Sequence, residues 1–146
     1  MYGSEIYDER GTLVKSIKGF KGTPHSYTSK KKEANDAAKG RAIYVIEVLR
    51  EKGNTKYRLG YKFISTEVFK KAGDAYWLDR YEFKNTVSYS KPVMGCYFEE
   101  PILIDSTEFN EWFKTRTFGM SKIPENLVDE LEKTIANPLH MAKQFT

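Results

Sequence analysis

The chain has 146 residues, of which 40% are hydrophobic and 30% charged, and its formal net charge is +4. This size and balance predict one globular domain with a core that needs neither metal nor disulfide, and no apolar run is long enough for a membrane span or a signal peptide. Because the lone Cys96 excludes an internal disulfide and forms a poor zinc set with His25 and His140, we expect an intracellular, cytoplasmic protein without metal or cofactor.

The first third of the chain predicts short strands and one helix. Residues 4–7 and 12–17 are strand candidates within a glycine-rich stretch. Residues 29–39 predict a short, very polar helix, since Ser29 suits an N-cap, three alanines favour helix and Gly40 ends it. The basic excess of the chain lies between Lys15 and Arg41, the stretch that contains this helix.

The middle of the chain predicts a sheet. Residues 42–49 are β-branched and apolar on both faces, which is typical of a central strand. A turn signal at residues 52–55 leads into a second strand at residues 57–64. We expect one face of that strand to carry Tyr57, Leu59, Tyr61 and Phe63, and the other to carry Arg58, Gly60 and Lys62.

The remaining sequence predicts further strands and then two helices. Residues 66–72 predict a helical turn, residues 80–89 a third strand, and residues 101–104 a fourth. A helix follows, capped by Asp105 or Ser106, with Glu108 completing a capping box with Asp105 and Trp112 facing inward. Pro124 opens the last helix at its first position, and an apolar stripe follows it: Leu127, Val128, Leu131 and Ile135.

These elements predict an α+β domain with a curved mixed or antiparallel sheet, or a small barrel, and flanking helices. We expect residues 1–25 to form an N-terminal extension packed on the domain. Residues 26–136 would form the domain itself, and residues 137–146 a tail or linker.

Aromatic and basic side chains alternate through residues 42–90, a combination that suits stacking of a nucleobase beside its phosphates. The candidate phosphate contacts are Lys30, Lys31, Lys32 and Arg41, with Arg116 and Lys122 as a second cluster. The alternative is that these lysines only form a solvated helix face. Nucleic acid is the expected partner, and the chain shows no motif typical of an enzyme.

Four segments follow one another in an order that resembles a known family. The first comprises residues 26–29, the polar helix and residues 40–45. The others are residues 59–63, residues 76–83, and residues 115–120 with the final helix. In this order the chain, over roughly residues 26–136, resembles the PUA-like superfamily and, within it, the EVE and YTH domains that read modified bases. A similar fold serves as the N-terminal recognition domain of McrB-type restriction systems. The resemblance implies a PUA-like barrel and binding of a methylated base that is flipped into an aromatic pocket. Methylated DNA is the favoured partner, and RNA also fits.

Five residues are candidates for that pocket. Trp77 lies at a loop-to-strand transition, where pocket residues are common, and its alternative role is to fill space between the sheet and a helix. Tyr27 matches the pocket-bearing position of the resembled families. Tyr61 is a further candidate ring, although its alternating face is more typical of core. Ser26 and Thr28 would bond the base edge, unless they serve in turns.

Two other functions stay open from the sequence. A protein-interaction domain of a larger assembly would use the rings as core only. A Mg²⁺-dependent nuclease is suggested faintly by Glu82 and Lys84 on a strand, with Asp74 and Asp79 upstream. The polar strand face that carries Glu82 argues against the nuclease.

Overall fold

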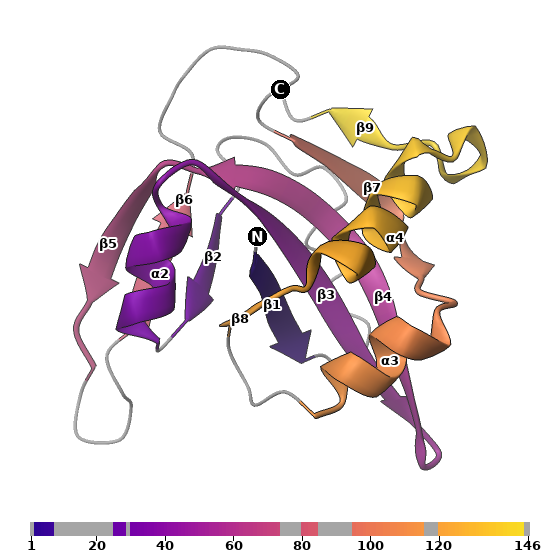
Figure 1. Ribbon diagram of the computed structural model, residues 1–146. Helices are drawn as coiled ribbons and strands as arrows, with labels where there is room; N and C mark the ends of the chain where they lie inside the picture. The colour runs from indigo at the N-terminus through magenta and orange to yellow at the C-terminus, as the bar shows by residue number, and fades with distance from the viewer. Residues whose placement is uncertain are drawn as a thin grey trace.

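The computed structural model describes residues 2–7, 25–28, 30–73, 80–84, 95–115 and 120–144 (Figure 1). The prediction of an α+β domain with a mixed sheet and flanking helices is confirmed. One six-stranded sheet has the order β8-β1-β3-β4-β7-β9, and a three-stranded sheet has the order β2-β6-β5. In the part of the chain that is described, β8 and β9 are the edges of the larger sheet, which does not close into a barrel.

The larger sheet consists of β1 (Tyr2–Tyr7), β3 (Arg41–Glu51), β4 (Asn54–Ser65), β7 (Gly95–Leu103), β8 (Met120–Lys122) and β9 (Lys143–Gln144). The smaller sheet consists of β2 (His25–Thr28), β5 (Glu67–Lys71) and β6 (Arg80–Lys84). The helices are α2 (Lys31–Ala37), α3 (Thr107–Phe113), α4 (Glu125–Ala136) and the short 3-10 turn η2 (Pro138–His140). In Figure 1 α3 and α4 lie across one side of the large sheet, and α2 lies beside the small sheet.

The β3–β4 hairpin is the centre of the large sheet. Glu51 pairs with Asn54, so the loop consists of Lys52 and Gly53, which both have positive φ values, 47° and 82°. Two positive φ values at the centre of a two-residue loop match the right-handed twist of the flanking strands, and glycine adopts one without strain. The predicted turn is therefore confirmed. β1 runs parallel to β3, whereas the other pairs of this sheet are antiparallel.

A β-bulge at Gly60 divides β4 into two halves. Ile46 pairs with Leu59 and Val45 with Tyr61, so Gly60 has no partner opposite it on β3. One extra residue reverses the side on which the following side chains lie. The prediction that Tyr57, Leu59, Tyr61 and Phe63 share one face is therefore wrong.

The bulge helps to create two separate cores. On the α3/α4 side of the sheet, Tyr57 and Leu59 join a core that also contains these buried residues: Tyr44, Ile46, Val48, Phe98, Ile104, Phe109, Phe113, Ile123, Leu127, Val128 and Leu131. On the other side, Tyr61 and Phe63 join Ala34, Ala37, Ile43 and Val45. Alternate residues of β3 thus contribute to both cores, which explains why its sequence is apolar on both faces.

Two predicted elements differ from the structure, and two others are described only in part or not at all. Residues 67–71 form strand β5 rather than a helical turn, since they pair with β6 over their whole length. Strand β7 begins at Gly95, ahead of the predicted start at residue 101. The third predicted strand is described only as far as Lys84, and residues 12–17 lie outside the described residues.

The helix caps also differ in detail. Ser106 is the N-cap of α3 and its side chain accepts a hydrogen bond from the Phe109 N–H, so Glu108 is one position too early to complete a capping box. Lys30 occupies the N-cap of α2, and Pro124 occupies the N-cap of α4 instead of its first position. The apolar stripe of α4 and the inward position of Trp112 are confirmed.

Buried tyrosines make the fold sensitive to alkaline pH. Burial raises the pKa of Tyr44 and of Tyr61, and the Glu132 carboxylate raises that of Tyr44 further. Because the folded pKa exceeds the unfolded value of about 10, the neutral tyrosine stabilises the fold fully below pH 10, and this stability is lost as pH rises above it. We expect the free energy of unfolding to fall by up to about 1.4 kcal/mol per pH unit for each tyrosine.

Urea unfolding between pH 9 and pH 11.5 measures this slope. Tyr61→Phe should reduce the slope, because it removes the titration of the Tyr61 phenol. A free energy of unfolding that stays constant up to pH 11.5 would contradict the raised pKa values of Tyr44 and Tyr61.

Candidate nucleic-acid interface

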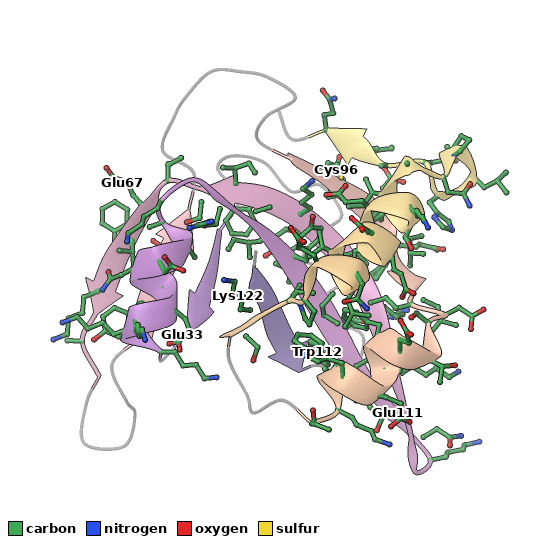
Figure 2. The ribbon with its side chains drawn as sticks, in the orientation of Figure 1. Glu33, Glu67, Cys96, Glu111, Trp112 and Lys122 are labelled. Atoms are coloured by element: carbon green, nitrogen blue, oxygen red, sulfur yellow. The ribbon has the colours of Figure 1, made fainter. Side chains whose placement is uncertain are left out.

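The basic candidates gather around α2. Lys31 and Lys32 are exposed at the start of the helix, and Arg41 is exposed where β3 begins. Lys122 is exposed on β8, which is in contact with α2, and Figure 2 shows it between α2 and β1. We call these four side chains the α2 basic surface. The structure therefore brings Lys122, from the second predicted cluster, to the first cluster, although 81 positions separate Arg41 from Lys122 in the sequence.

The sequence of α2 explains why its cations are exposed. Ala34 and Ala37, three residues apart, lie on one side of the helix and are completely buried against the second core. Alanine allows the helix to approach the sheet closely, and the lysines are left on the solvent side. Gly40, with a φ of 82°, ends the helix, and its N–H donates to the Ser65 carbonyl at 2.9 Å. This bond fixes the start of β3 and hence the backbone of Arg41.

Not every basic candidate is equally available. Lys30 is the half-buried N-cap residue of α2 and has an interaction of its own. Lys39, just past the helix, lies 3.9 Å from a carboxylate oxygen of Asp36. Within the described residues Lys31, Lys32, Arg41 and Lys122 take part in no ion pair. Arg116 lies outside the described residues.

The candidate pocket residues are placed only in part. Tyr27 lies on β2, opposite Glu82 of β6, and Thr28 lies opposite Tyr81. Ser26 pairs with Phe83 on the same two strands. The side chains of β2 and the whole of Trp77 lie outside the described residues. The backbone thus places Tyr27 four residues before the first residue of α2, on the strand that leads to the basic surface.

Tyr61 is a core residue. Its side chain is 6% exposed, and its ring centroid lies 6.0 Å from that of Phe63. Since such a ring has almost no free surface on which a base could stack, Tyr61 contributes to the shape of the core beneath α2. Its position therefore agrees with the alternative named from the sequence, a role in the core.

The acidic residues of the nuclease hypothesis do not form a described metal site. Glu82 is buried on β6 and has an interaction of its own. Asp74 and Asp79 lie outside the described residues. Among the residues that the structure describes, no group of three or more His, Cys, Asp or Glu side chains could hold a metal ion.

Sequence reasoning missed a polar cluster on the opposite side of the sheet. The Tyr44 hydroxyl donates to Glu132 Oε1 at 2.5 Å, and the Lys62 ammonium forms an ion pair with the same oxygen. Glu132 is on α4, 70 positions after Lys62. No local pattern could reveal this contact, because it depends on the bulge that turns Lys62 toward α4.

No protein-family model, curated protein or solved structure matches this chain. In addition, no helix within the described ranges is both long enough and apolar enough to cross a membrane.

Proposed function

We propose that this domain binds nucleic acid, with the α2 basic surface on the phosphates and a base, methylated in the favoured case, held by a pocket that contains Trp77 and Tyr27. The role is binding without catalysis. The observation that carries the proposal is the convergence of Lys31, Lys32 and Arg41 with Lys122, a residue from a distant part of the chain. Four exposed cations that form no ion pair with a described acidic residue attract a polyanion, because a bound phosphate replaces condensed counterions.

The fold is compatible with this function. The proposed arrangement is PUA-like, of the EVE and YTH type, in which a Ser/Thr-flanked segment and a short helix precede an apolar strand. The order β2, α2, β3 agrees with that description, and β2 carries Ser26, Tyr27 and Thr28 into the start of α2. A base taken from a single strand or flipped out of a duplex would then lie beside the cations that hold its phosphates.

Neutralising the basic surface should weaken binding. We expect the variant Lys31→Gln/Lys32→Gln to bind a fluorescent 12-nucleotide single strand about tenfold more weakly at 100 mM salt, since two phosphate contacts are lost. Fluorescence anisotropy measures the Kd. The matched control is Lys52→Gln/Lys56→Gln, which removes two exposed lysines at the tip of the β3–β4 hairpin. Equal weakening by both double variants would contradict a localised interface.

Removing the proposed pocket ring should abolish base preference. We expect the wild type to favour methylated over unmethylated oligonucleotides. Trp77→Ala should weaken binding of the methylated form by about 1–3 kcal/mol, the usual contribution of stacking on one base, and make the two affinities equal. Competition titrations with both oligonucleotides measure the preference. Weak, equal binding of every oligonucleotide by both proteins would remove the pocket from the proposal.

A protein-interaction role is the second candidate, favoured by exposed apolar side chains near the end of the chain. Leu139 is 85% exposed and Met141 71%, and Leu103 of β7 is exposed as well. Salt discriminates between the two roles, because phosphate contacts weaken steeply as salt rises whereas an apolar interface does not.

A further inference from the structure

A cavity of about 420 Å³ lies between α4, the ends of β4 and β7, and the C-terminal strand β9. Its described walls are the following residues: Lys62, Ile64, Gly95, Cys96, Ile135, Ala142 and Gln144. Figure 2 shows Cys96 on β7 close to β9. A volume in this range, with mostly apolar walls and a few converging polar groups, is typical of a small-molecule site.

Lys62 is the charged residue of this cavity. Among the described residues that line it, Lys62 alone carries a charge, because Glu132 contacts the Lys62 ammonium from α4 without lining the space. The ammonium also lies 5.5 Å from the centroid of the Tyr44 ring. An ammonium group has three N–H donors, and the contact with Glu132 uses one of them. Lys62 can therefore donate to a ligand without losing its ion pair.

Two features of the backbone build this site. The bulge at Gly60 turns Lys62 toward α4 instead of toward α2. Gly95 has a φ of 114°, and the position that its Cβ would occupy is 2.0 Å from the Lys62 carbonyl oxygen. The absence of a side chain at Gly95 thus lets β7 start directly against Lys62 and places Cys96 beside it.

The other residues that line the cavity indicate which further groups a ligand should have. Ile64, Ile135 and Ala142 present aliphatic surface. Burial raises the pKa of the Cys96 thiol, so the thiol is neutral at pH 7 and adds no negative charge that would repel an anion. The site therefore combines one ammonium group, which Glu132 contacts from α4, with an aliphatic lining.

We propose that this cavity binds a small amphipathic carboxylate, with its carboxylate on the Lys62 ammonium and its aliphatic chain against Ile64 and Ile135. The proposal does not depend on nucleic-acid binding. The α2 basic surface adjoins the core that contains Ile43 and Val45, whereas this cavity lies on the α4 side, over the face of β3 that carries Tyr44.

The rate at which Cys96, the single cysteine of the chain, is alkylated reports on binding in the cavity. Alkylation of Cys96 by iodoacetamide is followed by mass spectrometry, with and without hexanoate at up to 20 mM. We expect saturating hexanoate to slow alkylation at least fivefold. Hexylamine should not protect, because its charge has the wrong sign, and hexanol should protect less than hexanoate. Absence of protection by hexanoate, or equal protection by all three compounds, would overturn the proposal.

Substitutions in the cavity test whether hexanoate protects Cys96 by binding there. Lys62→Met keeps the length of the side chain but removes its charge, and it should abolish the protection. Lys143→Met is the matched control, since Lys143 lies next to Gln144 but pairs with Glu99 outside this cavity, and it should retain the protection. Ile135→Phe fills the cavity and keeps Lys62, so it too should lose protection even if Lys62→Met fails to fold. Retention of the full fivefold effect in Ile135→Phe would overturn the proposed location.

Discussion

Replacing Arg58 with alanine should destabilise the domain by about 3–5 kcal/mol, because it leaves the carboxylate of Glu47 buried without its cation. The Glu47 side chain is 0% exposed and that of Arg58 22%, and the Arg58 guanidinium donates to Glu47 Oε1. Among the described residues Glu47 Oε2 has no hydrogen-bond partner, so the carboxylate depends on Arg58. Urea unfolding monitored by circular dichroism measures the change.

Two control variants separate this pair from ordinary ion pairs. Lys143→Ala breaks the exposed pair between Lys143 and Glu99 and should leave the stability almost unchanged, because water screens an exposed ion pair. The double variant Glu47→Met/Arg58→Met should recover most of the loss, since apolar side chains of similar length need no charge partner. An Arg58→Ala protein as stable as the Lys143→Ala protein would show that Glu47 does not depend on this guanidinium.

Replacing Gly95 with alanine should destabilise the domain by about 2 kcal/mol or more, because the new methyl group would overlap the Lys62 carbonyl. The Cβ position lies 2.0 Å from that oxygen and 2.7 Å from Phe63 Cα, both of them backbone atoms that cannot rotate away. β7 must then move away from β4, and the Cys96 wall of the cavity moves with it. Thermal unfolding and the Cys96 alkylation rate should both change.

Gly40→Ala is the matched control for this substitution. Gly40 also has a positive φ, 82°, but no atom of the described part of the chain lies within 4 Å of its Cβ position. Its substitution should therefore show only the backbone strain of a left-handed alanine, about 1 kcal/mol. If the two variants are equally stable, the close approach of Gly95 to β4 is incorrect.

The elements that sequence predicted well are those whose pattern is local. The central strand β3, the turn at Lys52 and Gly53, and the apolar stripe of α4 follow from periodicity and turn chemistry within a few residues. The α2 cations were also predictable, because two alanines leave the lysines on the opposite side of a short helix.

The parts that sequence missed depend on contacts between distant segments. The bulge at Gly60 comes from the pairing of β4 with β3 and β7, and alternation along β4 alone conceals it. The local sequence of β5 is compatible with a helical turn, and only its pairing with β6 makes it a strand. Tyr61 could not be separated from a pocket ring by residue type, and only the bulge places it in the core beneath α2. The grouping of Lys122 with α2 likewise depends on the pairing of β8 with β1.

The two faces of β3 belong to two different cores. Ile43 and Val45 pack under α2, next to the basic surface, while Tyr44 and Ile46 pack under the α3/α4 layer that borders the cavity. One strand thus supports two proposed sites on opposite sides. We therefore expect hexanoate and an oligonucleotide to bind without excluding each other.

The central claim is that the α2 basic surface neutralises nucleic-acid phosphates, and the dependence of Kd on salt tests it most directly. Titrations of a single-stranded oligonucleotide between 50 and 300 mM salt give the slope of log Kd against log salt concentration for the wild type and for Lys31→Gln/Lys32→Gln/Arg41→Gln/Lys122→Gln. With about 0.7 per phosphate contact on a single strand, the account predicts a slope smaller by about 3 in the quadruple variant. Identical slopes in the two proteins would contradict it.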